Sequence, residues 1–289
     1  MKKWGFFVII ILLLLGLKAM NITPTVQQTH KDIAKEDHDI QRGTLTSAQT
    51  INITQDQVYQ GNLLLVNKEY PVHQDSVQSD VVNLFEHKEL LQGYGLLDTH
   101  IQLSERVAQK FLKMIEAAEK DGIQHFLISS GYRDFEEQRS LYQEKGSDYA
   151  LPAGYSEHNL GLSLDIGSTQ MEMSKAPEGE WLQKNAWRYG FILRYPKDKT
   201  AITGIQYEPW HFRYVGLPHS AIMKENNLVL EQYLDFLKEH KSTSTVVNGT
   251  TYDVMYHPIS HNMTLEIPVH HHYETSGNNI DGVIVTVSK

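Results

Sequence analysis

The chain has 289 residues, no cysteine, and a formal net charge of −9 from 26 Lys and Arg against 35 Asp and Glu. This acidic balance argues against a general nucleic-acid binder, which presents a basic face. Without cysteine there are no disulfides and no thiolate ligands, so any metal must be held by histidine, carboxylate, carbonyl or water. The length corresponds to one large or two small domains, and the 40% of hydrophobic residues is enough for an ordinary buried core.

The N-terminus carries a short apolar segment. Lys2 and Lys3 precede the run WGFFVIIILLLLGL at residues 4–17, and Lys18 follows it. A basic start followed by an apolar core is the layout of a secretory signal, and no clear cleavage site follows. We expect an uncleaved signal anchor over residues 1–20, with the rest of the chain outside the cell membrane. A cleaved signal peptide is the alternative.

A polar segment separates this run from the folded part. Residues 21–57 are rich in Thr, Gln, Asp, Lys and His, and they contain few large apolar side chains. Such a segment cannot bury enough apolar surface to fold, so it predicts a disordered stalk. Folding signals begin near residue 58, and the central domain is expected to extend to residue 240.

The central domain reads as a mixture of helices and strands. Apolar residues at helical spacing predict a helix over 104–120. Asp134 is placed to cap a second helix, with Glu137 completing a capping box. The other expected elements are strands at 125–129, 162–166 and 207–215, a helix at 177–189, and helical sequence at 220–240 in one or two pieces.

The pattern of apolar and polar residues changes after residue 240. Short alternating runs, an Asn248-Gly249 hairpin signal and the apolar run 283–287 predict a small β-rich region over residues 241–289. Together with the central domain, this predicts an α+β protein with a β-rich C-terminal appendage.

The stretch SEHNLGLSLD at 156–165 contains the first candidate metal ligands. On a strand, Leu162 and Leu164 face a core, and Asp165 faces the opposite, open side. His158 lies on the loop that leads into this strand, so the chain can direct both side chains at one centre. A buried salt bridge between them is the alternative to half of a metal site.

The stretch EPWH at 208–211 supplies a third ligand. Zinc hydrolases commonly use three protein ligands and leave a fourth position for water. We therefore predict that His158, Asp165 and His211 bind Zn²⁺. Glu208, three residues before His211, is predicted to be the general base that takes a proton from water. Pro209 favours an irregular strand that brings Glu208 and His211 into the same cleft.

A cation is needed near the negative charge that develops during hydrolysis. Arg133 is the predicted residue, because it lies between an expected strand and the start of a helix, where a side chain can reach a cleft. Arg194 and Arg213 are the rivals for this role. His219 is a candidate hydrogen-bond partner for a ligand histidine, and Trp210 is a candidate wall of the cleft or a core residue.

Four segments carry a family resemblance: SSGYRDFEEQ at 129–138, GYSEHNLGLSLDIG at 154–167, GFILRYP at 190–196 and YEPWHFRYVG at 207–216. They resemble the VanY-type D-Ala-D-Ala carboxypeptidases, a zinc peptidase group that includes VanX, VanXY and LD-carboxypeptidases. The zinc signatures of the group, SxHxxGxxxD and ExxH, are both intact, from Ser156 to Asp165 and from Glu208 to His211. The resemblance covers about residues 58–240.

The resemblance implies an α+β fold in which a small antiparallel sheet carries a zinc cleft. It implies removal of the C-terminal D-alanine from peptidoglycan precursor stem peptides, an activity that supports glycopeptide resistance in that family. It also implies that Arg133 steadies substrate and oxyanion, that Gln138 helps to hold the substrate, and that Ser156 binds near the terminal D-Ala carboxylate.

Two alternatives to this activity stay open from the sequence. One is a related cell-wall peptidase, either an L,D-carboxypeptidase or an endopeptidase, which would use the same zinc machinery. The other is a membrane-tethered module that binds muropeptides without cutting them. The intact Glu208 argues against the binding module, because a binder has no need of that base.

Overall fold

The computed structural model describes residues 27–29, 48–147 and 150–289. The predicted anchor over residues 1–20 therefore lies outside the described part. Within the described part, no helix has the length and apolar character needed to cross a membrane.

A five-stranded sheet lies at the centre of the first half of the molecule. Its strands follow the order β4-β6-β7-β9-β8, and neighbours are antiparallel except for the parallel pair β4 and β6. This confirms the predicted α+β domain with a small, mainly antiparallel sheet. The strands are β4 Tyr94–Leu96, β6 Phe126–Ser130, β7 Ser163–Ser168, β8 Phe191–Leu193 and β9 His211–Tyr214.

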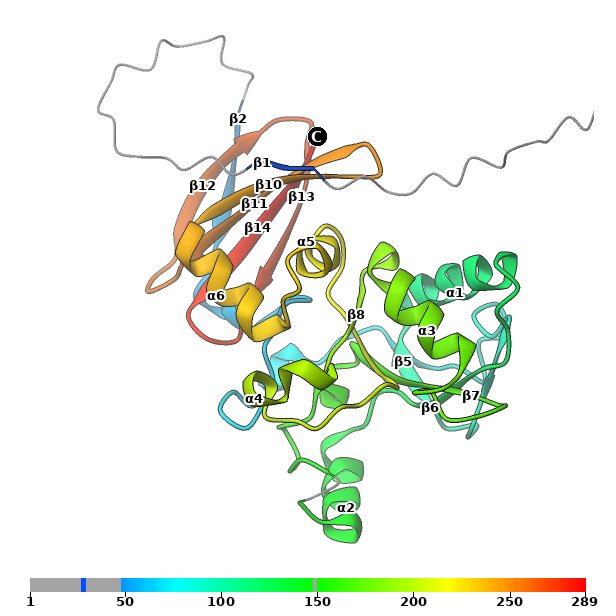
Figure 1. Ribbon diagram of the computed structural model, residues 1–289. Coiled ribbons are helices and arrows are strands. Elements are labelled where there is room, and N and C mark those ends of the chain that lie inside the picture. Colours follow the sequence, from blue (N-terminus) through cyan, green and yellow to red (C-terminus); the bar gives the residue numbers. More distant parts are fainter. Residues whose placement is uncertain (1–26, 30–47, 148–149) are drawn as a thin grey trace, which may run out of the picture.

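Helix α1, Glu105–Lys120, packs an apolar face on this sheet (Figure 1). Ser104 caps its first turn by accepting a hydrogen bond from the backbone of Val107. Phe111 of α1 contacts the ring of Phe191 edge-on in the main core. The helix predicted over 104–120 is therefore confirmed, and it closes one face of the sheet.

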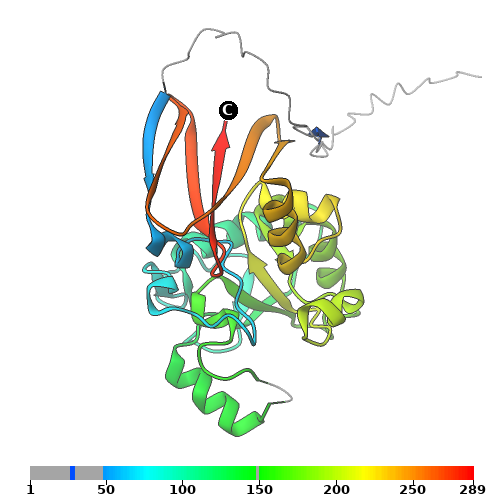
Figure 2. The same ribbon diagram turned by 90° about the vertical axis from the view of Figure 1, so that its left-hand side faces the viewer.

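Helix α2, Phe135–Lys145, projects from the rest of the domain (Figures 1 and 2). The capping box predicted for it is present, since Asp134 accepts from the backbone of Glu137 and the Glu137 side chain accepts from the backbone of Asp134. The remaining elements of this half are β3 Val81–Asn83, β5 Gln102–Ser104, α3 Pro177–Asn185, the 3-10 turn η4 Ala186–Tyr189 and α4 Thr200–Thr203.

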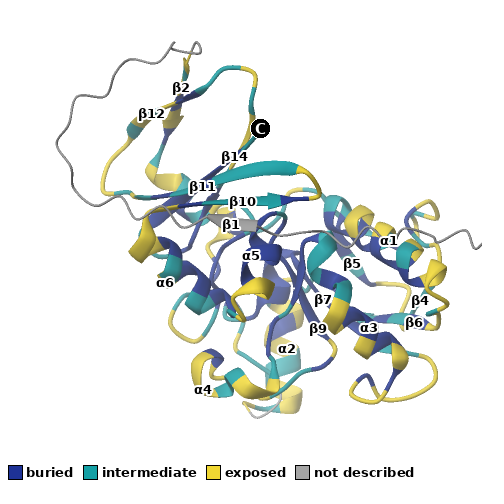
Figure 3. Cartoon of the chain, turned by 45° about the horizontal axis from the view of Figure 1, so that its top comes forward, coloured by how far each residue is buried: buried dark blue, intermediate teal, exposed yellow. Residues whose placement is uncertain are grey.

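The C-terminal region is a second sheet with the strand order β1-β10-β11-β14-β13. Asn248 and Gly249 both have positive φ between β10 and β11, as the predicted hairpin requires. Helices α5, His219–Glu225, and α6, Leu230–His240, lie between the two sheets, and α5 is largely buried (Figure 3). The strands are β1 Gln27–Thr29, β10 Ser242–Val247, β11 Thr250–Pro258, β13 His272–Gly277 and β14 Gly282–Ser288.

The disordered stalk predicted over residues 21–57 is wrong for residues 27–29, which form β1, and for residues 48–57; its other residues lie outside the described part. Strand β2, Ala48–Ile53, pairs with β12, Met263–Pro268, beside the C-terminal sheet (Figure 2). Ile51 and Ile53 are buried in a small apolar core with strands from the C-terminal region. The polar composition of this segment concealed a strand, because only alternate residues of β2 face that core.

Candidate active site

His158 and Asp165 reach the site from adjoining elements. His158 lies on the 3-10 turn η3, Glu157–Leu160, and Asp165 lies on β7. Gly161 ends the turn with a φ of 81°, a left-handed conformation that glycine adopts at no steric cost and that directs the chain into β7. Leu164 is fully buried and Asp165 points to the opposite side, as strand alternation predicted.

The structure brings the three predicted metal ligands together. Asp165 Oδ1 lies 3.4 Å from His158 Nε2 and 3.0 Å from His211 Nδ1. Two ligands bound tetrahedrally to zinc at about 2.0 Å are separated by about 3.3 Å, so these distances fit the ion. Among the residues that the structure describes, His158, Asp165 and His211 form the one group of three metal-binding side chains, with ligand atoms within 4.8 Å of one another.

The His158 ring is oriented by a backbone carbonyl. Its Nδ1–H donates to the oxygen of Gly131 over 2.6 Å, which leaves Nε2 free to face Asp165. Such a contact fixes the tautomer of a metal-binding histidine. Gly131 cannot be replaced easily, because a Cβ there would lie 2.1 Å from the carbonyl oxygen of Gln102.

The His211 ring is oriented by a carboxylate that the sequence analysis missed. Its Nε2 lies 3.5 Å from Glu157 Oε2, so Nδ1 is left to face Asp165. Glu157 is buried and also pairs with Arg194 and Arg213, each at 2.8 Å. Despite burial, these arginines hold the pKa of Glu157 well below its ordinary value. The only signal in the sequence was the position of Glu157 next to His158.

The two rival arginines do not serve the cleft. Arg194 and Arg213 are fully buried, and Arg194 is held on its other side by Glu231 at 2.7 Å. Arg213 donates to the backbone oxygens of Asn62 and Leu64. These contacts assign both side chains to the internal network around Glu157 rather than to the substrate.

Glu208 lies at the edge of the metal-binding group. Its Oε2 is 3.8 Å from His211 Nδ1. Residues 208–211 form a turn closed by a bond from the backbone of His211 to the oxygen of Glu208, so β9 starts only at His211 and the strand predicted over 207–215 is shorter. This turn directs both side chains to one side. Burial raises the pKa of Glu208, which suits a group that must accept a proton.

The pKa values of Asp165 and His211 are shifted in opposite directions by their mutual contact. Burial opposes the charge of Asp165, but the two histidines hold its pKa well below its usual range. Burial also disfavours a charged His211, yet the carboxylates of Asp165 and Glu157 raise its pKa to about 9. The site therefore favours a positive charge beside Asp165, which a bound cation supplies.

Arg133, Gln138 and Ser156 line the same cleft of about 550 Å³. The Nε of Arg133 and the Oε1 of Gln138 are buried, and neither has a hydrogen-bond partner. Buried polar atoms without partners are rare, so a cleft that contains two is suited to a polar ligand. Gln138 is held in place by donating to the oxygen of Leu151, and Ser156 caps the turn that carries His158.

Other residues singled out in the sequence lie elsewhere or have different partners. Trp210 lines the cleft and remains 42% exposed, so it is not a core residue. His219 does not contact a ligand histidine, because its ring nitrogens face Tyr233 and Thr286. Lys68 also lines the cleft and was not singled out in the sequence.

Comparison with known proteins gives the same assignment. Residues 100–217 match the family model described as VanY, D-alanyl-D-alanine carboxypeptidase. A D-alanyl-D-alanine carboxypeptidase from Enterococcus faecium is 57% identical over 293 aligned positions, which cover 99% of this chain and 96% of the relative.

Two solved structures share the fold. One is the vancomycin resistance D,D-dipeptidase VanXYg in complex with a D-Ala-D-Ala phosphinate analog, with a TM-score of 0.73 and 32% identity over 84% of this chain and 100% of that chain. The other is a variant of the D,D-pentapeptidase VanY from a VanB-type resistance cassette in complex with Zn(II), with a TM-score of 0.50 and 32% identity over 60% of this chain and 98% of that chain. The chain belongs to the VanY family of D-alanyl-D-alanine carboxypeptidases.

Proposed function

We propose that this protein is a zinc-dependent D,D-carboxypeptidase that removes the C-terminal D-alanine from peptidoglycan precursor pentapeptides ending in D-Ala-D-Ala. The observation that carries the proposal is the convergence of His158, Asp165 and His211, with Glu208 at the edge of the group, in one cleft. Membership of the VanY family and the Zn(II) complex of its relative support the same reaction and metal.

His158 Nε2, Asp165 Oδ1 and His211 Nδ1 would hold the zinc ion. When bound there, zinc supplies Lewis-acid activation of the attacking water and of the scissile carbonyl. Glu208 takes the proton from the water and passes it to the leaving amine of D-alanine. Its raised pKa matches both steps, because the carboxylate must gain and then lose that proton.

The other cleft residues bind and orient the peptide. Arg133 faces the charge that develops on the carbonyl oxygen, with its guanidinium in the field of Asp165 and Glu208. Gln138 Oε1, buried and without a partner, accepts a hydrogen bond from a peptide N–H. Ser156 lies near the carboxylate of the terminal D-alanine.

The cellular consequence follows from the product. Glycopeptides of the vancomycin type bind D-Ala-D-Ala termini, so loss of the last residue removes their target and contributes to resistance. The N-terminal segment is proposed to hold the catalytic domain on the outer side of the cell membrane. Cell fractionation tests this placement: the full chain should follow the membrane fraction, and a variant without residues 1–20 should not be exported.

The activity is tested by incubating the full-length protein with a muramyl pentapeptide ending in D-Ala-D-Ala and measuring the products by mass spectrometry. We expect loss of one alanine, abolished by a chelator and reduced about 10²–10⁴-fold in Glu208→Gln, because that variant lacks the proton acceptor. The matched control is Glu136→Gln, an exposed carboxylate on α2, which should leave the rate unchanged.

Two outcomes would redirect the proposal. Cleavage of a tetrapeptide or a cross-link, with the pentapeptide intact, would keep the zinc site and change the specificity. Binding of zinc and peptide without any cleavage would point to a muropeptide-binding module.

A further inference from the structure

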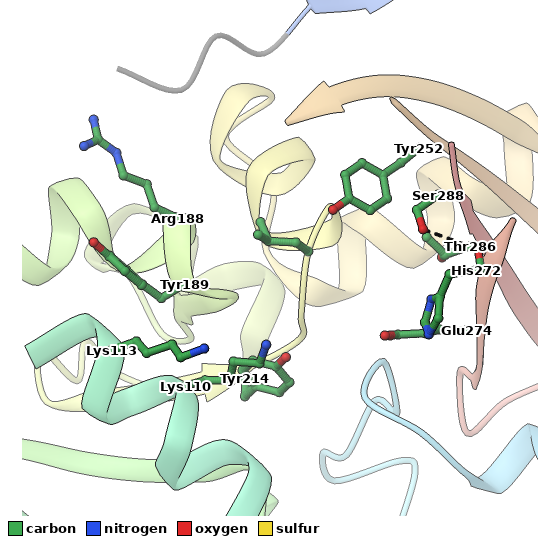
Figure 4. Close-up of a pocket in the computed structure, with 11 residues that line it drawn as sticks. Lys110, Lys113, Arg188, Tyr189, Tyr214, Tyr252, His272, Glu274, Thr286 and Ser288 are labelled. Carbon is green, nitrogen blue, oxygen red and sulfur yellow. Dashed lines mark hydrogen bonds between the residues drawn. The ribbon is translucent and has the colours of Figure 1, made fainter. Parts of the chain in front are cut away.

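A second cavity of about 310 Å³ lies between helix α1, the turn η4 and the C-terminal sheet (Figure 4). Strand β9 contributes to both cavities, with His211 in the zinc cleft and Tyr214 in this one. Residues three apart on a strand face opposite sides, so the central sheet separates the two cavities. Neither proposed catalysis nor the proposed metal site uses any residue of this second cavity.

Its lining is basic in a protein whose formal net charge is −9. Lys110 and Lys113 lie three residues apart on one face of α1, and they extend into the space between α1 and the C-terminal strands (Figure 4). Arg188 lies at the rim on η4. The lining contains one acidic residue, Glu274 on β13, together with these three basic residues.

These three cations have no acidic partner within the described part of the chain. No carboxylate there lies within 4.0 Å of Lys110, Lys113 or Arg188, and both lysines are exposed to solvent at the cavity. The Nε of Arg188 is also buried without a hydrogen-bond partner. Unneutralised Lys and Arg side chains that share a concave surface favour an anion, and phosphate takes hydrogen bonds from both types.

The rest of the lining suits a sugar. Tyr189, Tyr214 and Tyr252 bring three aromatic rings to the cavity. Thr286 and Ser288 also line it, with hydroxyls that bond within the protein to His219 Nε2 and to the oxygen of His272. Tyrosine offers an apolar ring and a polar tip, so it packs against a sugar ring and also hydrogen-bonds its hydroxyls. The volume lies at the lower end of the range for small-molecule sites, which is roughly 300–1,000 Å³.

We propose that this cavity is a second ligand site that binds a sugar phosphate, with Lys110 and Lys113 holding the phosphate and Tyr252 packing against the sugar. The site is independent of the zinc cleft. Its existence does not depend on the reaction proposed above, because it rests on different residues on the other face of the sheet.

Isothermal titration of the zinc-loaded, full-length protein with N-acetylglucosamine 1-phosphate tests the proposal. We expect saturable binding that Lys110→Gln/Lys113→Gln weakens about tenfold or more, because hydrogen bonds to charged groups are lost. Lys120→Gln is the matched control, since it removes the same charge from an exposed position on the same helix but outside the cavity, and it should bind as the parent does.

A second comparison tests the sugar part. Inorganic phosphate should bind more weakly than the sugar phosphate, and Tyr252→Ala should weaken only the sugar phosphate. Tyr252→Phe separates loss of the hydroxyl from loss of the ring, and circular dichroism verifies that each variant folds.

Three results would overturn the proposal. The first is no binding at millimolar ligand, and the second is equal binding by the parent and the double lysine variant. A phosphate held by zinc in the cleft would give that second result, and a chelator would then abolish the binding. The third is equal affinity for inorganic phosphate and for the sugar phosphate, together with no effect of Tyr252→Ala. In that case the cavity would bind phosphate without recognising a sugar. Peptide hydrolysis by the double lysine variant should stay at the parent rate, so a failure of the catalytic proposal is recognised separately.

Discussion

Glu157 occupies a position that links stability to metal binding. Its carboxylate contacts His211 on one side and two buried arginines on the other. Partners behind a ligand histidine set its orientation and basicity, and their loss typically lowers metal affinity about 10–100-fold. Removing one member of a buried ion network also leaves uncompensated charge, which costs about 3–5 kcal/mol.

We therefore expect Glu157→Gln to lower both zinc affinity and the free energy of unfolding. Competition with a chromophoric chelator measures the affinity, and urea unfolding measures the stability. Glu231→Gln is the control, because Glu231 pairs with Arg194 but makes no contact with His211. It should lose stability and keep the zinc affinity. If both variants bind zinc equally well, Glu157 does not position His211.

His219 predicts a pH dependence of stability. Burial lowers the pKa of His219 to about 3, and its ring contacts Tyr233 and Thr286 in the neutral form. The unfolded chain binds a proton at this residue below about pH 6.5, whereas the folded chain does not. The contribution of neutral His219 to the free energy of unfolding is thus fully present above about pH 6.5. It is lost as the pH falls toward 3, and the free energy of unfolding then decreases by up to about 1.4 kcal/mol per pH unit.

Urea unfolding at pH 7.5 and pH 5 measures this effect in the parent and in His219→Gln. Between pH 7.5 and pH 5, the free energy of unfolding of the parent should fall by about 2 kcal/mol more than that of the variant. The reason is that pH 5 lies about 1.5 pH units below the pKa of histidine in the unfolded chain. Equal losses in both proteins would mean that folding does not lower the pKa of His219.

The candidate site was largely predictable because its residues lie in two short motifs. His158 and Asp165 are seven positions apart across a turn and a strand, and Glu208 and His211 are joined by one turn. Local geometry therefore fixes most of their relative directions. Glu157 was missed because its role comes from Arg194, Arg213 and His211, which belong to other strands and turns.

Strand β2 has a role that the sequence concealed. Its pairing joins Ala48 to Pro268 and Ile53 to Met263. The pairing of β2 with β12 also closes the small core that contains Ile51 and Ile53. Burying an isoleucine side chain contributes about 1.5–3 kcal/mol, so β2 is expected to stabilise the C-terminal region considerably.

Truncation tests this expectation. A fragment of residues 48–289 should unfold at a distinctly higher urea concentration than a fragment of residues 58–289, because the shorter one lacks both buried isoleucines and the β2–β12 pairing. In the longer fragment, Ile53→Ala should cost about 2–5 kcal/mol. Equal midpoints for the two fragments would show that β2 adds nothing to the fold.

For the molecule as a whole, a bound zinc ion would join two segments of the central domain that lie far apart in the sequence. His158 and Asp165 lie in one segment, and His211 follows 46 residues after Asp165 on the neighbouring strand β9. An ion bound by all three residues would hold the paired strands β7 and β9 together. A ligand that binds only the folded state stabilises it by about 4 kcal/mol when present at a thousand times its dissociation constant.

We expect a chelator to lower the melting temperature by several degrees, measured by scanning calorimetry with and without added zinc. His211→Ala should melt at the same temperature in both conditions, because it lacks one of three ligands. Lys120→Gln should respond to zinc as the parent does, which controls for an effect of surface charge. A chelator response that persists in His211→Ala would place the stabilising ion at another site.

Local sequence was enough to establish the α+β class, the capped helices, the Asn248-Gly249 hairpin and the metal-binding motifs. Each of these depends on residues within about twenty positions of one another, where periodicity, capping and turn chemistry act. Tertiary structure alone decided the pairing of β2 with β12, the burial of Arg194 and Arg213 around Glu157, and the basic cavity between α1 and the C-terminal sheet. These features arise where distant segments meet, and no local pattern records which distant partner a side chain will find.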